Sequence, residues 1–329
     1  MRILSAATNQ KNMKAVICPK YGSPEVLQIQ EITKPTPKDN QILVKIMASA
    51  VNSGDVRVRS LNVEGILKLI MRMVLGFWKP RKPVLGTVFS GVITETGKNV
   101  SKFRVGEKVF GMTGFDFGTH TEFIAVHQNS NVMPMPENAS FEEAAAIIFG
   151  GQTALYYLKK ANISERYQPK VLIIGATGAV GIAAVQIAKS FQAKVTTVSS
   201  SSGAQLIQTI GVEKMIFYDK EDFTKQLATF DIIFDAVGKS SKTQCKKLLR
   251  KNGAYISVTI GYASESLSQL QFLKTLFEKG NYHAAIDKIY SMEEIIEAHR
   301  YVESGRKKGN VVLKICDSSE KQAESTTGK

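Results

Sequence analysis

The chain has 329 residues, 43 lysines and arginines against 29 acidic residues, and a formal net charge of +14. This length favours two domains, and 43% hydrophobic with 22% charged residues is typical of a globular protein. No apolar run reaches the length of a membrane span, and the N-terminus lacks the apolar core of a secretory signal. Three distant cysteines, Cys18, Cys245 and Cys316, form no C-x-x-C pair, so we expect buried thiols and a cytoplasmic protein.

The excess of positive charge has two interpretations. It solubilises the surface, or it lines a cleft for an anionic ligand such as a dinucleotide. No helix-turn-helix, RNA-recognition or zinc-finger signature accompanies it, so nucleic acid is not an expected partner.

Short apolar or alternating runs separated by Pro, Gly, Asn and Asp predict a mostly β first part, residues 14–135, of barrel type. The expected strands are Val26–Ile32, Ile42–Val51, Val88–Thr94, Lys108–Met112 and His120–Val126. We expect residues 1–12 to be a disordered extension and the polar residues 317–329 a disordered tail.

The pattern changes near Pro136. Ser140 and Glu143 have the spacing of a capping box, which predicts a helix over Ala144–Leu158, interrupted at Gly150–Gly151. Strands and helices then alternate, which predicts a doubly wound parallel sheet. Its expected strands are Val171–Ile174, Val195–Val198, Met215–Tyr218, Ile232–Asp235 and Tyr255–Val258. After Gly261 the predicted elements are helices Leu270–Glu278 and Met292–Ser304 and a final strand Val311–Ile315.

The most informative stretch follows the first of these parallel strands. Val171–Gly175 leads into a glycine-bearing turn and then a helix with apolar residues at Val180, Ala183, Ala184 and Ile187. Such a turn presents backbone N–H groups to a pyrophosphate, here at Gly178, Ala179 and Val180. Ala176 replaces the first glycine of the usual G-x-G-x-x-G pattern, so the context carries the prediction. The alternative is an ordinary tight turn that binds no ligand.

Seven motifs in a fixed order resemble the zinc-independent quinone oxidoreductases of the medium-chain dehydrogenase/reductase superfamily, the zeta-crystallin-like family. They cover the chain from Met13 to about Ile315. The motifs are Val51-Asn-Ser-Gly-Asp55, Leu85-Gly-Thr-Val-Phe-Ser-Gly-Val-Ile93, Val105-Gly-Glu-Lys-Val-Phe-Gly111, Gly150-Gly-Gln-Thr-Ala154, Gly175-Ala-Thr-Gly-Ala-Val-Gly181, Asp235-Ala-Val-Gly238 and the stretch from Ala298 to Val312.

The resemblance implies an architecture. A GroES-like β-barrel domain would comprise residues 13–135 and 262–316, with a Rossmann dinucleotide-binding domain, residues 136–261, inserted between them. It also implies a homodimer formed through the Rossmann domains, and an active site between the two domains of each chain.

The zinc ligands of related alcohol dehydrogenases are missing. This chain has Ser53 where those enzymes have a cysteine and Thr87 where they have a histidine, and the four-cysteine structural lobe is absent. We read His120 and His127 as surface or core histidines and expect no metal. Without a Lewis acid, hydride transfer to a conjugated acceptor is favoured over alcohol chemistry.

The cofactor prediction rests on the end of the second parallel strand. The serine run that includes Ser199 and Ser200 has no carboxylate to bind a ribose 2′-OH, which favours NADPH over NADH, although no Lys or Arg follows directly. By resemblance, Tyr218 lies at the adenosine phosphate, with a core aromatic as the alternative. Thr153 lies near the nicotinamide, or bonds to the preceding turn. Other cofactor positions implied by the resemblance are Val237, Gly238, Gly309 and Asn310.

On the substrate side, Asn52 is the candidate for positioning a carbonyl or the nicotinamide ribose. Asp55 has the more ordinary role of capping the following helix. No general acid stands out, so the proton is expected from solvent. The segment 61–83 interleaves large apolar and basic residues, which indicates a packed helical insertion, a lid for lipophilic substrates or a membrane-touching element.

These observations predict an NADPH-dependent, zinc-independent oxidoreductase that transfers hydride to a quinone or an α,β-unsaturated carbonyl. The alternative is a nucleotide-binding protein without enzymatic activity that uses its basic surface for RNA, and turnover with quinones would separate the two.

Overall fold

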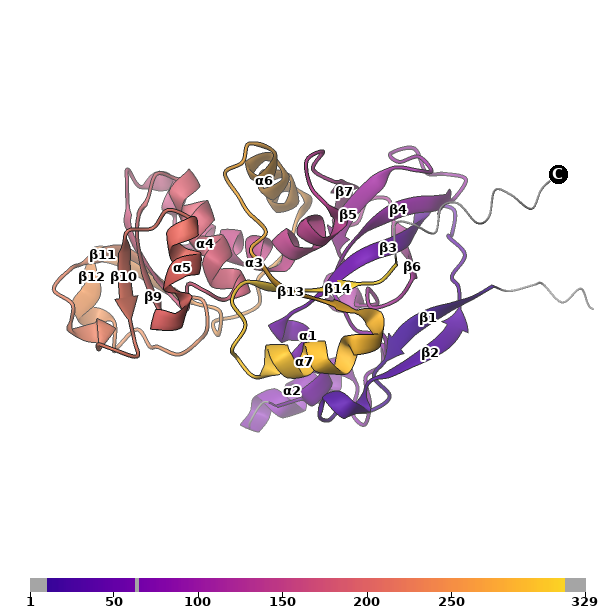
Figure 1. Ribbon diagram of the computed structural model, residues 1–329, viewed down its shortest axis with the longest axis horizontal. Helices are drawn as coiled ribbons and strands as arrows, with labels where there is room; N and C mark the ends of the chain where they lie inside the picture. The colour runs from indigo at the N-terminus through magenta and orange to yellow at the C-terminus, as the bar shows by residue number, and fades with distance from the viewer. Residues whose placement is uncertain (1–10, 63–64, 317–329) are drawn as a thin grey trace, which may run out of the picture.

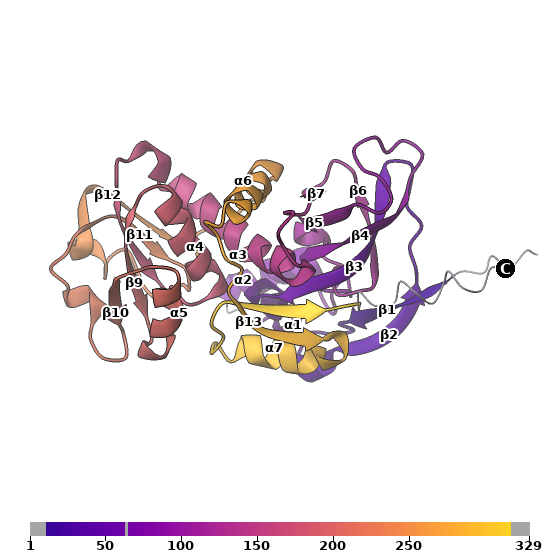
Figure 2. The same cartoon turned by 45° about the horizontal axis from the view of Figure 1, so that its top comes forward.

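The computed structural model describes residues 11–62 and 65–316, which form two lobes side by side (Figures 1 and 2). Within these residues one lobe is built on a seven-stranded sheet and the other on a five-stranded sheet. Helix α3 (Phe141–Lys160) runs between the lobes. This mixed α/β architecture, a GroES-like domain with a parallel Rossmann sheet, is the predicted fold class.

The first lobe combines strands from both ends of the chain. Its sheet has the order β13-β14-β3-β4-β5-β7, with β6 also pairing with β3. Strand β14 runs antiparallel to β3, with Val311 opposite Val51. The strands are β3 (Gln41–Val51), β4 (Val88–Thr96), β5 (Lys108–Met112), β6 (Phe123–His127), β7 (Val132–Pro134), β13 (Ile286–Ser291) and β14 (Asn310–Lys314).

A two-stranded ribbon of β1 (Asn12–Ile17) and β2 (Gln28–Thr33) lies beside this sheet. Since β1 already begins at Asn12, the predicted extension over residues 1–12 is wrong at its last position. Residues 1–10 and the predicted tail 317–329 lie outside the described residues. The first lobe also carries α1 (Ser53–Ser60), α2 (Gly65–Leu75) and α7 (Ile295–Glu303).

The second lobe is the predicted parallel sheet, in the order β10-β9-β8-β11-β12. The strands are β8 (Lys170–Ile174), β9 (Lys194–Ser199), β10 (Lys214–Phe217), β11 (Phe230–Asp235) and β12 (Leu249–Ser257), with helices α4 (Ala179–Ser190) and α5 (Ala204–Thr209). Helix α6 (Leu267–Glu278) packs on α3 and on β7 of the first lobe. Short 3₁₀ turns occupy Pro24–Val26, Gly114–Asp116, Ile163–Glu165, Ser201–Gly203, Phe223–Lys225, Lys246–Leu248 and Met292–Glu294.

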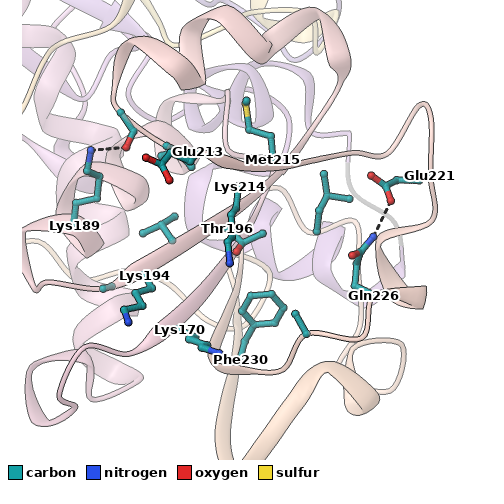
Figure 3. Close-up of a pocket in the computed structure, with 16 residues that line it drawn as sticks. Lys170, Lys189, Lys194, Thr196, Glu213, Lys214, Met215, Glu221, Gln226 and Phe230 are labelled. Atoms are coloured by element: carbon teal, nitrogen blue, oxygen red, sulfur yellow. Dashed lines mark hydrogen bonds between the residues drawn. The ribbon is translucent and has the colours of Figure 1, made fainter.

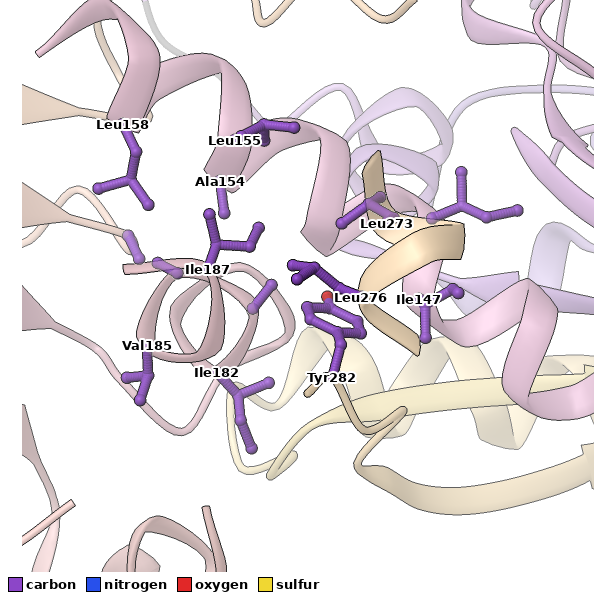
Figure 4. Packing of buried hydrophobic residues seen from close by; sticks show 14 of the residues in the cluster. Ile147, Ala154, Leu155, Leu158, Ile182, Val185, Ile187, Leu273, Leu276 and Tyr282 are labelled. Carbon is purple, nitrogen blue, oxygen red and sulfur yellow. The ribbon is translucent and has the colours of Figure 1, made fainter. Parts of the chain in front are cut away.

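Helix α3 continues through Gly150–Gly151, so the predicted interruption is wrong. The reason is helix packing: a Cβ added at Gly150 would lie 2.3 Å from the carbonyl oxygen of Ala179, at the start of α4. The two glycines therefore bring α3 close to its neighbours and do not break it. Figure 4 shows the resulting core, a single cluster that includes Leu155 and Ile147 of α3, Ile187 and Ile182 of α4, and Leu273 of α6.

Two other features bear on the sequence predictions. The three cysteines are buried, as expected. No helix within residues 11–62 and 65–316 is both long and apolar enough to cross a membrane.

Candidate active site

The turn after β8 leaves backbone donors available. Gly178 is the N-cap of α4 and offers no side chain to cap it. The N–H groups of a helix's first turn have no acceptor within the helix, so this turn can present backbone donors to a ligand. A Cβ built on Gly178 would meet only the Gly175 carbonyl oxygen, at 3.6 Å. With a φ of −76°, this backbone does not require glycine either, so its small size leaves room for something outside the chain.

The neighbouring glycines, Gly175 and Gly181, are required by close packing within the turn. Gly175 has a φ of +77°, and a Cβ there would lie 2.4 Å from Cγ1 of Val237. A Cβ on Gly181 would lie 2.1 Å from the carbonyl oxygen of Gly175. These two glycines serve the turn's own packing. Gly178 alone of the three leaves a cradle at a helix N-terminus, where an anionic pyrophosphate fits.

The C-terminal part of the chain reaches this turn. Gly309 donates its N–H to the Thr177 carbonyl at 2.7 Å and forms a parallel bridge with Gly178. Gly309 therefore lies directly beside the turn that carries Gly178. The Asn310 side chain does not face a ligand: it is buried, and its amide donates to the Ala284 carbonyl at 2.6 Å. Its side chain holds β14 in place.

Two charged side chains from other parts of the chain, Asp219 and Lys308, contact the serine run after β9. Ser199 is buried with its hydroxyl on the Ser200 carbonyl, so Ser200 and Ser202 provide the outward hydroxyls. Asp219 accepts from the Ser201 N–H at 2.8 Å and its hydroxyl at 2.6 Å. The ammonium group of Lys308 donates to the Ser202 carbonyl. A carboxylate and a cation therefore both lie at this end of the site, and sequence reasoning missed both because neither is near the run in the chain.

Tyr218 lies beside this run, with its N–H donating to the Ser199 carbonyl at 3.0 Å. The side chain is 61% exposed, so the alternative of a core aromatic is wrong. An exposed ring next to the serines is available to cover the adenosine portion of a dinucleotide.

Asp235 organises the turn that follows β11. Its carboxylate is buried and accepts from the N–H groups of Val237, Gly238 and Ser240 at 2.7–3.1 Å. This fixes Val237 over Gly175 with its side chain 45% exposed. The sequence motif contained Asp235, but only the hydrogen bonds reveal that it acts as the anchor.

Thr153 is half-buried on α3, one turn after Gly150. Gly150 packs against the start of α4. Because residues three apart share one face of a helix, Thr153 also faces the start of α4. The turn after β8, the serine run, the turn after β11 and Gly309 thus gather at the carboxyl ends of the parallel strands, where ligands of such sheets bind.

Asn52 and Asp55 form a complete capping box at the start of α1. The Asn52 side-chain oxygen accepts from the N–H groups of Gly54 and Asp55, and Asp55 accepts from the Asn52 N–H at 2.9 Å. The Asn52 amide also donates to the Thr87 hydroxyl at 3.0 Å. The predicted cap is therefore confirmed for Asp55, and Asn52, the candidate for substrate positioning, is itself the N-cap residue. Burial raises the pKa of Asp55 to about 7.

The histidines are distributed as core and surface residues. His120 is fully buried against His299, with ring centroids 6.1 Å apart, and desolvation lowers its pKa to about 4. His127 is exposed. In the part of the chain that the structure describes, no three His, Cys, Asp or Glu side chains are placed to hold a metal ion.

A groove lined by several lysines lies at the amino ends of the parallel strands (Figure 3). Its lysines include Lys170, Lys194 and Lys214, which are the first residues of β8, β9 and β10. Gly178 follows the carboxyl end of β8, so this groove is separate from the dinucleotide site.

Two family models match the chain. The alcohol dehydrogenase GroES-like domain matches residues 38–137, and the zinc-binding dehydrogenase model matches residues 179–289. A 2-methylene-furan-3-one reductase of Solanum lycopersicum is 30% identical, covering 92% of this chain and 79% of that protein. The chain belongs to the quinone oxidoreductase family of the medium-chain dehydrogenase/reductase superfamily. The zinc-binding dehydrogenase model matches only residues 179–289, so its match does not include Ser53 and Thr87. Neither of these two residues can supply a thiolate or imidazole ligand for zinc.

Other members of the superfamily agree with this assignment. The human mitochondrial NAD(P)H oxidoreductase RTN4IP1 is 32% identical over 79% of this chain and 68% of its own. The solved quinone oxidoreductase from Coxiella burnetii has a TM-score of 0.82 and 27% identity, covering 93% of this chain and 100% of that one. This family member is thus an oxidoreductase with a nicotinamide cofactor, and the alternative of a protein without enzymatic activity is not favoured.

Proposed function

We propose that the chain transfers hydride from NADPH to a quinone or an α,β-unsaturated carbonyl, without zinc. The hydrogen bond from Asn52 to Thr87 carries this proposal. It joins the residue next to Ser53 to Thr87, and the side chains of Ser53 and Thr87 offer neither a thiolate nor an imidazole at the positions where related dehydrogenases carry zinc ligands.

The residues divide the task between binding and orientation. The N–H groups of Ala179 and Val180 bind the pyrophosphate beside Gly178. Val237, held by Asp235, and Thr153 border the nicotinamide from two sides. When bound, the reduced nicotinamide supplies the hydride. The proton comes from solvent.

Without a Lewis acid, the site favours a hydride acceptor whose double bond is already conjugated. Hydride addition to a simple carbonyl builds charge on one oxygen, which a Lewis acid would stabilise. In a quinone or enone, conjugation spreads that charge. The test is NADPH oxidation with a panel of quinones, enones, aldehydes and ketones. We expect turnover with the first two classes, and turnover confined to simple aldehydes or ketones would refute the proposal.

Metal analysis tests the zinc-independent part separately. Purified protein should contain far less than one zinc per chain, and chelators should leave NADPH oxidation intact. Stoichiometric zinc whose removal abolishes turnover would overturn it.

The preference for NADPH is supported by Lys308, whose ammonium group lies at Ser202 and suits a 2′-phosphate. Asp219 opposes it, but both of its oxygens already accept from Ser201. We expect Lys308→Met to weaken NADPH binding about tenfold and NADH binding little, because one charge-assisted contact is lost. Lys247→Met, at an exposed lysine elsewhere on the Rossmann lobe, is the control. Wild-type preference for NADH would contradict the assignment.

We also propose a homodimer formed through the Rossmann lobes. Strand β12 is one of the two edges of its sheet, pairs on one side only among the described residues, and can therefore pair with a second copy. Sedimentation analysis should give twice the chain mass, and a monomer at micromolar concentration would exclude the dimer.

The three buried cysteines support a cytoplasmic location, which fractionation of the source cells would test.

A further inference from the structure

Helix α2 has an apolar face that the other residues described by the structure, within 11–62 and 65–316, leave exposed. On its inner side, Leu75 is buried in a cluster with Val58 and Phe117, and Met71 packs against the same cluster. On its outer side, the exposed fractions are 49% for Leu69, 45% for Ile70, 55% for Met73 and 57% for Val74. Within the helix, Leu69 and Ile70 are three to five residues from Met73 and Val74, so these four side chains form one apolar stripe. In Figure 1, α2 lies at the lower margin of the molecule.

Two aromatic residues extend this stripe, and the turn that carries them is fixed. Phe77 is 47% and Trp78 81% exposed, and their rings contact each other edge to face at 5.1 Å. The Arg81 N–H donates to the Leu75 carbonyl at 2.7 Å, and the Tyr21 hydroxyl to the Gly76 carbonyl at 2.7 Å. The turn thus holds both rings outward at a defined position.

The charges around the stripe have one sign. Residues 65–82 contain Lys68, Arg72, Lys79, Arg81 and Lys82 and no Asp or Glu. Lys82 pairs with Asp116, outside this segment, while Lys79 and Arg81 are exposed beside Trp78. An apolar stripe with a cationic rim and an aromatic end is complementary to the interface of an anionic bilayer.

We propose that the outer face of α2 together with Phe77 and Trp78, here called the α2 face, docks the enzyme on the surface of an anionic lipid bilayer. The helix Gly65–Leu75 is about 16 Å long, about half of what a span needs, so it lies in the interface plane. A second copy is a poorer occupant, because a symmetric contact would bring the cations of two copies together with no acid in the segment to pair with them. This inference does not depend on the identity of the hydride acceptor.

Trp78 makes the proposal directly measurable because it is the single tryptophan of the chain. The probe is vesicles of phosphatidylcholine with 30% phosphatidylglycerol, compared with vesicles of phosphatidylcholine alone. With the anionic vesicles we expect a blue shift of the tryptophan emission, protection from iodide quenching and co-sedimentation, all weakened at 0.5 M salt. Unchanged emission together with absent sedimentation would refute the proposal.

Variants separate the apolar from the electrostatic contribution. Met73→Ser with Val74→Ser, and separately Lys79→Gln with Arg81→Gln, should each lower vesicle partitioning about tenfold or more. Leu227→Ser is the matched control, since Leu227 is a 98% exposed leucine of the other lobe. Circular dichroism and dinucleotide affinity check that each variant is folded.

Three other results would overturn the proposal. The first is vesicle binding that survives both double substitutions unchanged. The second is equal loss with Leu227→Ser. The third is a change in Trp78 emission with protein concentration in the absence of lipid, abolished by Met73→Ser with Val74→Ser, which would assign the α2 face to a second copy.

Discussion

Helices α1 and α4 differ in whether side chains of the chain accept hydrogen bonds from the backbone N–H groups at the helix start. At α1, Asn52 and Asp55 form a capping box, and the remaining Asn52 donor goes to Thr87. At α4, the N-cap is Gly178, which has no side chain to offer. One helix start is closed by its own chain, and the other stays open to an anion. This comparison teaches that an uncapped start, where no packing demands the glycine, is the better indicator of a ligand than a polar side chain nearby.

The strongest test of the comparison is Gly178→Val. The side chain would fill the cradle, and losing two charge-assisted hydrogen bonds should weaken dinucleotide binding by about 100-fold or more. The melting temperature should change little, because a Cβ at this position meets only one atom, at 3.6 Å. Fluorescence titration with NADPH and thermal unfolding are the measurements. Undiminished affinity would remove the turn from the site.

Gly181→Ala changes a glycine of the same motif and should have the opposite signature. Its Cβ would lie 2.1 Å from the Gly175 carbonyl oxygen, so α4 must move away from the turn. We expect about 1–3 kcal/mol lower stability toward denaturant, the usual range for overpacking. A variant as stable as wild type would show that the helix has room to shift.

Asp55→Asn tests the closed helix start through pH. Burial raises the Asp55 pKa to about 7, whereas in the unfolded chain it is near 3.9. Between these values the folded protein keeps a proton that the unfolded chain releases, so the wild type loses stability as pH rises, by at most about 1.4 kcal/mol per pH unit. Asparagine keeps an acceptor for the Asn52 N–H and cannot ionise. The variant should therefore gain stability relative to wild type from pH 4 to pH 7, and identical pH profiles would contradict this.

Asn52→Ala should have the smallest effect, about 1 kcal/mol lost from the free energy of unfolding, as for other N-cap truncations. Asn52→Ser keeps a capping oxygen but lacks the amide that donates to Thr87, and should be close to wild type in stability. If Asn52→Ser nevertheless lowers kcat for quinones with KM unchanged, Asn52 also positions the reacting groups.

Much of the fold followed from local patterns, because hydrophobic period and turn chemistry act over a few residues. The parallel strands were predicted to within a few residues, apart from the early start of β12 at Leu249. The glycine pair in α3 was misread because a glycine that allows close helix packing has the same letter as one that ends a helix. Strand β13 was missed since its pairing with β14 is a property of the assembled sheet.

The site shows the same division. Gly178 and its turn are contiguous in sequence and could be predicted. Lys308 and Asp219 reach the serine run only through the fold, and no local signal marks them. The roles of Asn52 and Asp55 were separable only by their hydrogen bonds, since either residue type can cap a helix.

The return of β14 to β3 sets the order in which this protein can be completed. Val311 pairs with Val51, so the first lobe waits for the last part of the chain to leave the ribosome. At about 5–20 residues per second, that delay lasts roughly ten seconds or more. During this time the stretch of β3 that β14 will cover lacks its neighbour and is exposed to other nascent chains. Loss of the C-terminal strand would therefore damage the half of the molecule that is made first.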